Sequence, residues 1–190
     1  ILRSGHHMLD LIGDVLDLAK IESSNFSLDL ENEDPGPMID ACLKMIGGSA
    51  AQNGISVRGQ LPAGDLPLVR IDALRFKQAL LNLLSNAVKY NRPNGKVTLE
   101  CSSDTNRKLH ISVSDTGPGI PRNMRDKVFE PFDRLGAESS DITGTGIGLS
   151  VSKQLIEGMG GSIGFKSAVG EGTTFWIEVP LASSEANTAL

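Results

Sequence analysis

Asn82-Leu-Leu-Ser-Asn86-Ala-Val-Lys89-Tyr90 forms the second half of a helix that we expect over residues 72–90. Apolar side chains occupy most of this helix, which predicts that it is largely buried. At roughly 100° per residue, the polar side chains share an arc of about 100°; they are Gln78, Asn82, Ser85, Asn86 and Lys89. Buried amides need hydrogen-bond partners, and solvent faces more often carry Glu and Lys than Asn and Gln. The stripe therefore indicates either an ordinary solvent face or, as we favour, a ligand site.

The chemistry of the stripe suits a metal–phosphate ligand. Mg²⁺ takes oxygen ligands and is commonly completed by water and substrate phosphates. The side-chain oxygen of Asn86, together with that of Asn82, is a candidate ligand, and neutral amides suffice because the phosphates bring the negative charge. Lys89 lies one turn further along the same face, where it can meet a phosphate as a point charge.

Glycine-rich turns follow the helix. Asp115-Thr-Gly117-Pro-Gly119 comes directly after a strand expected over residues 107–114, and an aspartate there can accept a hydrogen bond from an exocyclic amine such as that of adenine. Taken alone, the motif also fits an ordinary turn. Gly144-Thr-Gly146-Ile-Gly148 opens a helix expected over residues 147–159, where unpaired backbone N–H groups attract anions. Leu149 replaces the third glycine of the dinucleotide fingerprint, and the chain contains no P-loop sequence.

Apolar periodicity and turn residues predict the other elements. Residues 1–23 read as a helix whose broad apolar face requires a bundle. The cap Asp34 and the following proline start a helix that runs to residue 53. Residues 115–146 form a long loop, and we expect residues 121–143 to act as a lid that orders on nucleotide binding. Strands are expected over residues 26–30, 55–61, 68–71, 96–102, 107–114, 162–167 and 173–181.

Composition narrows the class of protein. The 190 residues carry a net charge of -5 and are 39% hydrophobic, which is typical of a soluble domain. The negative charge argues against a nucleic-acid partner. No apolar run is long enough for a membrane span. Cys42 and Cys101 lack metal-ligand spacing and favour a reducing cytoplasm.

Order and spacing of the motifs together resemble the catalytic ATP-binding domain of sensor histidine kinases, in the family that includes DNA gyrase and chaperone ATPases. Residues 82–90 resemble the asparagine box, and residues 115–119 the first glycine box. Phe129-Glu-Pro-Phe132-Asp-Arg134 is similar to the phenylalanine box of the lid, and residues 144–149 and 170–175 are similar to the later glycine boxes. The resemblance implies an α/β fold, a two-layer α/β sandwich of the Bergerat type with a mixed sheet and helices on one face. One bundle helix precedes it.

The resemblance also implies a role for each motif residue. Asp115 would hold the adenine amine, with Thr173 or Thr174 nearby through water. Asn82 and Asn86 would handle Mg²⁺, and phosphate contacts would come from Lys89, Tyr90 and Arg134. The catalytic residues would be Asn82, Lys89 and Arg134. The pocket and lid would be shaped by Gly117, Gly119, Ile120, Gly144, Thr145, Gly146, Gly148 and Leu149.

The implied function is ATP-dependent protein histidine kinase activity within a two-component phosphorelay. Residues 1–24 resemble the second helix of a dimerisation hairpin, residues 25–182 the catalytic domain, and residues 183–190 a flexible tail. The accepting histidine would lie on an upstream helix outside this chain, and neither His6 nor His7 matches the acceptor motif. Related ATPases carry a water-activating glutamate at the position of Asn82. The asparagine in this chain therefore favours phosphoryl transfer over hydrolysis.

Partners and alternatives follow from the same resemblance. We expect ATP and Mg²⁺ as ligands, a homodimer through the hairpin in the full-length protein, and a response regulator receiver domain as partner. We expect neither nucleic acid nor membrane contact for these residues, and a cytoplasmic location whether or not the parent protein is membrane-anchored. Two alternatives remain open: a nucleotide-binding regulatory module without kinase activity, and an ATPase of the same superfamily.

Overall fold

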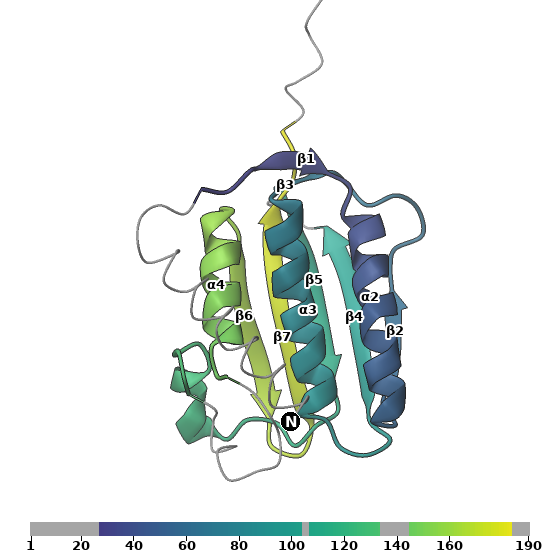
Figure 1. Ribbon diagram of the computed structural model, residues 1–190, viewed down its shortest axis with the longest axis vertical. Coiled ribbons are helices and arrows are strands. Elements are labelled where there is room, and N and C mark those ends of the chain that lie inside the picture. The colour runs from purple at the N-terminus through teal and green to yellow at the C-terminus, as the bar shows by residue number, and fades with distance from the viewer. Residues whose placement is uncertain (1–26, 104–106, 134–144, 184–190) are drawn as a thin grey trace, which may run out of the picture.

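The structure is a computed structural model that describes residues 27–103, 107–133 and 145–183. The helix expected over residues 1–23, Arg134 and Gly144 lie outside the described residues. Within them, strands and helices form two layers, with one mixed sheet covered on one face by three helices (Figure 1). The sandwich predicted from the sequence is confirmed.

The sheet has five strands in the order β2-β4-β5-β7-β6. β2 (Ser56–Gln60) runs parallel to β4 (Lys96–Ser103), whereas the remaining pairs are antiparallel. β5 (Lys108–Asp115) occupies the centre, β7 (Gly172–Pro180) is its other neighbour, and β6 (Ser162–Ala168) forms the far edge. Because β5 is the central strand, Asp115 at its C-terminal end lies midway across one end of the sheet.

The three covering helices are α2 (Pro35–Gln52), α3 (Ala73–Lys89) and α4 (Gly148–Gly158), and α3 packs between the other two. The predicted N-cap Asp34 is confirmed, and Asp72 caps the helix that the sequence predicts from residue 72 onward. Asp34 accepts a hydrogen bond from the amide of Gly36, and Asp72 accepts from the amides of Leu74 and Arg75. These local bonds satisfy backbone donors that a helix start otherwise leaves open, so both helices begin where the sequence predicts.

A second, two-stranded sheet crosses one end of the molecule. β1 (Glu31–Glu33) pairs antiparallel with β3 (Val69–Ile71). The strand predicted over residues 26–30 is therefore wrong in position, because residues 27–30 join no ladder. Leu28 and Leu30 alternate for another reason: both pack partly buried against the core.

The core lies between the large sheet and the helices. Leu80, Leu83 and Leu84 of α3 are fully buried, as are Leu99 of β4 and Ile111 of β5. Cys42 and Cys101 are both free and buried, where they pack as small apolar residues. Burial raises the pKa of the Cys101 thiol to about 12, so this thiol stays protonated and unreactive. The short 3-10 helix η1 (Arg122–Lys127) follows the first glycine turn.

Candidate nucleotide site

The polar stripe of α3 is less exposed to solvent than the outer face of a surface helix. Gln78, Asn82, Asn86 and Lys89 are all partly buried, whereas Ser85 is exposed. The opposite side of the helix carries seven buried apolar residues that anchor it against the sheet. The amides are therefore held on a fixed surface at the border of the core.

Asn82 is bound to α4. Its side-chain nitrogen donates a hydrogen bond of 2.9 Å to the hydroxyl of Ser152. A methyl group added at Gly148 would come within 2.4 Å of the Asn82 side-chain oxygen, so Gly148 leaves room for this carboxamide. The start of α4 and the middle of α3, 66 positions apart in the sequence, are thereby brought into contact.

Asn86 and Lys89 remain more available. Within the described part of the chain, the Asn86 carboxamide has no hydrogen-bond partner, although it is half-buried. The Lys89 ammonium lies 4.8 Å from the centroid of the Tyr90 ring, which is cation–π distance. The oxygen of a half-buried carboxamide without a partner is available to a cation that prefers oxygen ligands. The adjacent ammonium adds positive charge for an anionic ligand.

Asp115 sits at the end of β5 with one oxygen already occupied. Its Oδ1 accepts hydrogen bonds from the amide of Gly117 at 2.7 Å and from the amide of Thr173 at 3.2 Å. Burial raises the pKa of this carboxyl, and the two amide bonds oppose the rise. The amides hold Oδ1 in place, which leaves Oδ2 as the acceptor for a ligand.

The first glycine turn makes close contact with α3. A methyl group at Gly117 would lie 2.5 Å from the carbonyl oxygen of Tyr90 and 2.8 Å from Oδ1 of Asp115. At Gly172, the added methyl would lie 2.0 Å from the carbonyl oxygen of Asp115. Glycine is required at both positions because backbone passes where a side chain would be. The Asp115 turn, the end of α3 and the start of β7 therefore converge.

The two threonines of the last glycine motif face opposite sides of the sheet. Thr173 is buried beside Asp115. The Thr174 hydroxyl instead pairs with the hydroxyl of Ser114 at 2.8 Å, on the face away from the helices. Successive side chains of a strand point to opposite faces, so Thr173, and not Thr174, is the residue that the structure places next to Asp115.

The described residues that flank positions 134–144 contact each other. The Phe132 amide donates to the carbonyl of Gly146 at 3.0 Å, and Gly146 has φ of 74°. Thr145 accepts from the amide of Ile147 through its hydroxyl at 3.2 Å. Leu149, in the first turn of α4, is partly buried against the core. Phe129 packs edge-on against Phe165 and Phe175, while Phe132 is 61% exposed.

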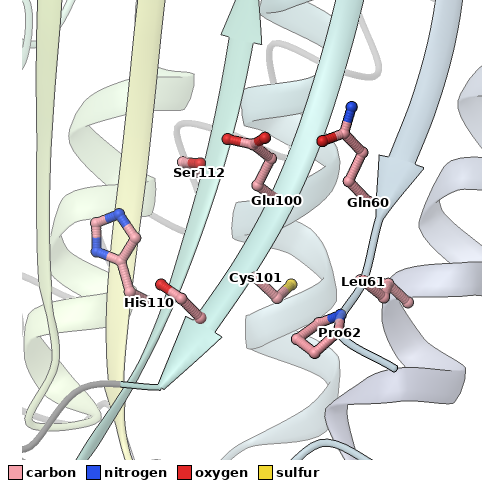
Figure 2. Close-up of a pocket in the computed structure, with 8 residues that line it drawn as sticks. Gln60, Leu61, Pro62, Glu100, Cys101, His110 and Ser112 are labelled. Atoms are coloured by element: carbon pink, nitrogen blue, oxygen red, sulfur yellow. The ribbon is translucent and has the colours of Figure 1, made fainter. Parts of the chain in front are cut away.

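A separate groove of about 500 Å³ lies on the sheet face that the helices leave open (Figure 2). None of the predicted site residues lines it. Its lining residues are Gln60, Leu61, Pro62, Glu100, Cys101, Ser102, His110 and Ser112.

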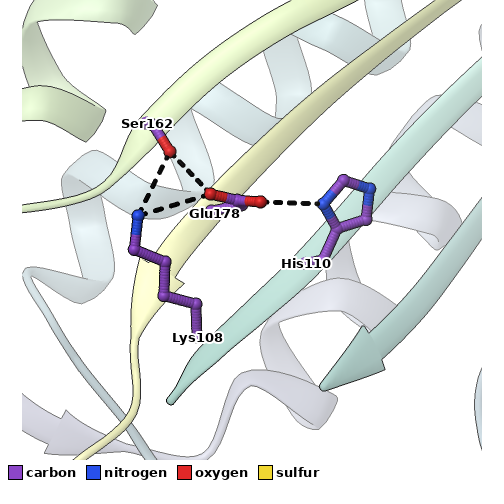
Figure 3. A network of polar contacts seen from close by, with 4 residues as sticks. All are labelled: Lys108, His110, Ser162 and Glu178. Atoms are coloured by element: carbon purple, nitrogen blue, oxygen red, sulfur yellow. Dashed lines mark hydrogen bonds and ion pairs between the residues drawn. The ribbon is translucent and has the colours of Figure 1, made fainter. Parts of the chain in front are cut away.

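The same open face carries a polar network beside that groove (Figure 3). Glu178 accepts from the hydroxyl of Ser162 at 2.8 Å, and its carboxylate lies 3.3 Å from the Lys108 ammonium and 3.5 Å from Nδ1 of His110. The Ser162 hydroxyl bond, followed by Lys108 and His110, lowers the pKa of Glu178. His110 also stacks on Trp176.

Sequence reasoning missed several residues that hold the site. Ser152 anchors Asn82, and Asn91 joins two loops by accepting from the Thr116 hydroxyl at 3.1 Å and donating to the Lys96 carbonyl. Ser167 and Arg125 link the first glycine turn to β6. None stands in a recognisable pattern, although the position of Ser167 opposite Thr173 follows from pairing the last two strands.

Comparison with known proteins defines the class. Residues 71–183 match the family described as histidine kinase-, DNA gyrase B- and HSP90-like ATPase. This match covers more than half of the chain. It includes α3, the glycine turn that begins at Asp115, and α4. The chain belongs to this family.

Within the family, the similar proteins are sensor histidine kinases. The virulence sensor protein BvgS of Bordetella bronchiseptica is 37% identical over 186 residues, which are 96% of this chain and 15% of that protein. The histidine protein kinase DivJ of Caulobacter vibrioides is 35% identical over 178 residues, or 94% of this chain and 30% of that protein. The chain thus spans less than a third of these curated relatives.

Solved structures give the same result. Full-length ShkA in complex with AMPPNP is similar with a TM-score of 0.83 and 32% identity, over 97% of this chain and 38% of that chain. The mycobacterial sensor histidine kinase MprB has a TM-score of 0.69 and 27% identity, over 80% of this chain and 98% of that chain. This chain is therefore homologous to the ATP-binding catalytic domains of two-component sensor histidine kinases. None of its described helices combines the length and the apolar character that a bilayer crossing requires.

Proposed function

We propose that the chain binds ATP across α3, with the adenine against Asp115 and the phosphates toward Asn86, Lys89 and the start of α4. One observation carries the proposal: glycines of two separate motifs lie against α3 at two points along its polar stripe. Gly117 lies against the Tyr90 carbonyl at one end of the stripe, and Gly148 lies against Asn82 further along it. A ligand reaching from Asp115 to α4 must therefore cross the amides.

Mg²⁺ fits the residues present. The half-buried Asn86 side chain, without a partner among the described residues, would supply a neutral oxygen ligand. Asn82 has its nitrogen engaged with Ser152, so its oxygen orientation is fixed and it acts second to Asn86. When bound, the ion would neutralise phosphate charge. Lys89 and Tyr90 line the same end of the stripe, and Arg134 is proposed for the phosphates from its motif position alone.

The reaction that fits these side chains is phosphoryl transfer to a histidine held on another segment. The partly buried positions of the stripe carry amides and an ammonium, with no carboxylate to activate a water molecule. Catalysis then rests on positioning and charge stabilisation, as is usual for phosphoryl transfer. Asp115 fixes the base and Lys89 compensates negative charge.

The parent protein supplies the remaining parts in this proposal. An upstream hairpin helix carries the accepting histidine and forms a homodimer, and the receiver domain of a response regulator takes the phosphoryl group. The histidine kinase ThkA, which shares the fold, has been solved in complex with response regulator protein TrrA. The free thiols Cys42 and Cys101 support a reducing, cytoplasmic location for this domain.

The test is incubation of the chain with Mg²⁺-ATP and a separately produced acceptor hairpin. We expect acid-labile, alkali-stable phosphohistidine on the hairpin. Asn86→Ala should abolish it, whereas Ser85→Ala, at the exposed neighbouring position, should not. Tight ATP binding without phosphohistidine would instead support a regulatory module, and release of inorganic phosphate without the hairpin would support an ATPase.

A further inference from the structure

Both backbone polar groups of Ile120 are bound by side chains outside the nucleotide motifs. Its amide donates a hydrogen bond of 2.7 Å to the hydroxyl of Ser167. Its carbonyl accepts a bond of 3.2 Å from Nε of Arg125. A second nitrogen of the same guanidinium donates to the backbone carbonyl of Ser167. Arg125 thus spans two carbonyls, one on Ile120 directly after the first glycine turn and one on β6.

This turn lies directly on the hairpin between β6 and β7. The amide of Gly170 donates to the Pro118 carbonyl at 2.8 Å. Gly119 has φ of 73°, and a methyl group there would lie 2.0 Å from the carbonyl oxygen of Ala168. Contact this close leaves little room for the turn to move against the hairpin, and the rigid fork of the Arg125 guanidinium bridges the same two segments.

Ser167 also fixes the Thr173 hydroxyl. Its oxygen lies 3.0 Å from the Gly172 carbonyl and 2.9 Å from the Thr173 hydroxyl, in addition to the Ile120 amide. A hydroxyl has one proton, and the carbonyl can only accept. Ser167 must therefore donate to Gly172, and Thr173 must donate to Ser167. All three bonds form together only in this arrangement.

Both walls of the Asp115 site depend on these contacts. One wall is the glycine turn, which reaches Asp115 through the Gly117 amide, and the other is β7, which reaches it through the Thr173 amide. Ser167 touches both walls, and Arg125 locks the outer end of the turn. Neither residue approaches the Asp115 side chain through a bond of its own.

We propose that Arg125 and Ser167 are positioning residues for the adenine pocket, and that they act by clamping the first glycine turn onto β6. The proposal rests on the proposed function, because it assumes that the base binds at Asp115. The clamp touches no ligand. Loss of the clamp would weaken binding because the loosened turn must first return to the geometry that the base requires.

The experiment measures the Kd of Mg²⁺-ATP and Mg²⁺-ADP by calorimetry for Arg125→Ala, Arg125→Lys and Ser167→Ala. Two matched controls are available. Arg122→Ala removes the same charge from the same 3-10 helix at an exposed position. Ser162→Ala removes a hydrogen-bonded hydroxyl from the other end of β6. Thermal unfolding without nucleotide is recorded for every variant, which identifies any that fails to fold.

We expect Arg125→Ala and Ser167→Ala to raise the Kd of ATP and ADP by the same factor, about tenfold, since the base is common to both ligands. Arg125→Lys keeps the charge but loses the fork, so it should raise both constants nearly as much. The controls should stay within about twofold of the wild type. The Ile120 amide should also lose hydrogen-exchange protection in Ser167→Ala.

An unchanged Kd in folded variants, with only the unfolding temperature lowered, would overturn the clamp and leave the two residues a purely structural role. A larger loss for ATP than for ADP would overturn it too, because the effect would then lie at the phosphates. Failure of the proposed function is recognised separately: the wild-type chain would bind neither nucleotide, or Asp115→Asn would bind ATP as well as the wild type.

Discussion

Replacing Asp115 by asparagine alters a single atom position of the proposed adenine site. Asparagine retains an oxygen that can accept the amide bonds from Gly117 and Thr173, which are 2.7 and 3.2 Å long in the structure. Its nitrogen then stands where Oδ2 stood and presents hydrogens to the adenine amine, itself a donor. The variant should therefore keep the fold and lose the contact with the base.

The expected loss can be estimated. A hydrogen bond to a charged group contributes about 1.5–3 kcal/mol. Since about 1.4 kcal/mol corresponds to a factor of ten in Kd, ATP should bind about 10- to 100-fold more weakly. Because the introduced side-chain nitrogen and the adenine amine are both donors, the loss of affinity should lie toward the upper end of this range.

Stability should change in the opposite direction. Burial raises the pKa of Asp115 above its ordinary value of 3.8. A carboxyl whose pKa is raised by folding stabilises the folded state while it is protonated, and this contribution is lost as the pH rises through the folded-state pKa. At neutral pH the ionised carboxylate is therefore a cost to the fold. Without nucleotide, Asp115→Asn should unfold at the same temperature as the wild type or at a higher one.

The assay is calorimetric titration with Mg²⁺-ATP and with the triphosphate of purine riboside, which lacks the amine. Asp126→Asn, at an exposed position of η1, serves as the matched control. Asp115→Asn should lose affinity for ATP and not for the purine riboside analogue. Equal loss for both ligands, or an ATP affinity within about twofold of the wild type, would refute the assignment of the amine contact.

Four further outcomes are expected. Asn86→Ala should bind ATP equally with Mg²⁺ and with EDTA, whereas chelation should weaken binding to the wild type; a retained Mg²⁺ effect would contradict the ligand role. Gly119→Ala should lower both stability and ATP affinity, because the positive φ and the backbone clash at this position add. Gly170→Ala is the control, since Gly170 has φ of 83° but open space around it. It should lower the thermal unfolding temperature through backbone strain and leave ATP affinity unchanged. Leu83→Ala, at a fully buried position, should cost about 2–5 kcal/mol in urea unfolding. ATP affinity should fall on acidification at a higher pH than an ordinary aspartate gives, since the pKa of Asp115 is raised; an unchanged profile in Asp115→Asn would argue against that origin.

Local signals predicted most of the elements. The caps Asp34 and Asp72 bind amides two or three residues ahead, so nearby residues are enough to start the helices. The alternation of β4, β5 and β7 reports a sheet with one buried face. The strand expected at residues 26–30 is wrong in position because alternation records burial of Leu28 and Leu30 and not hydrogen bonding.

The site was predicted less completely. The motifs named Asn86, Asp115 and Gly117, and the structure brings their segments together. The motif could not choose between Thr173 and Thr174, because the choice depends on which face of β7 meets Asp115. Arg125 and Ser167 carry no motif signal in this chain; the contacts they make join residues 42 positions apart.

The sequence by itself determined the class of site: amides at helical spacing, an aspartate at a strand end and glycines where backbones must approach closely. Such features are local, since they depend on the chemistry of a residue and its near neighbours. The tertiary structure alone decided which groups meet. It turned the nitrogen of Asn82 to Ser152, placed Thr173 beside Asp115 and clamped the glycine turn onto β6. These contacts follow from strand order and packing, which arise from the sum of many long-range interactions and are written in no single stretch of chain.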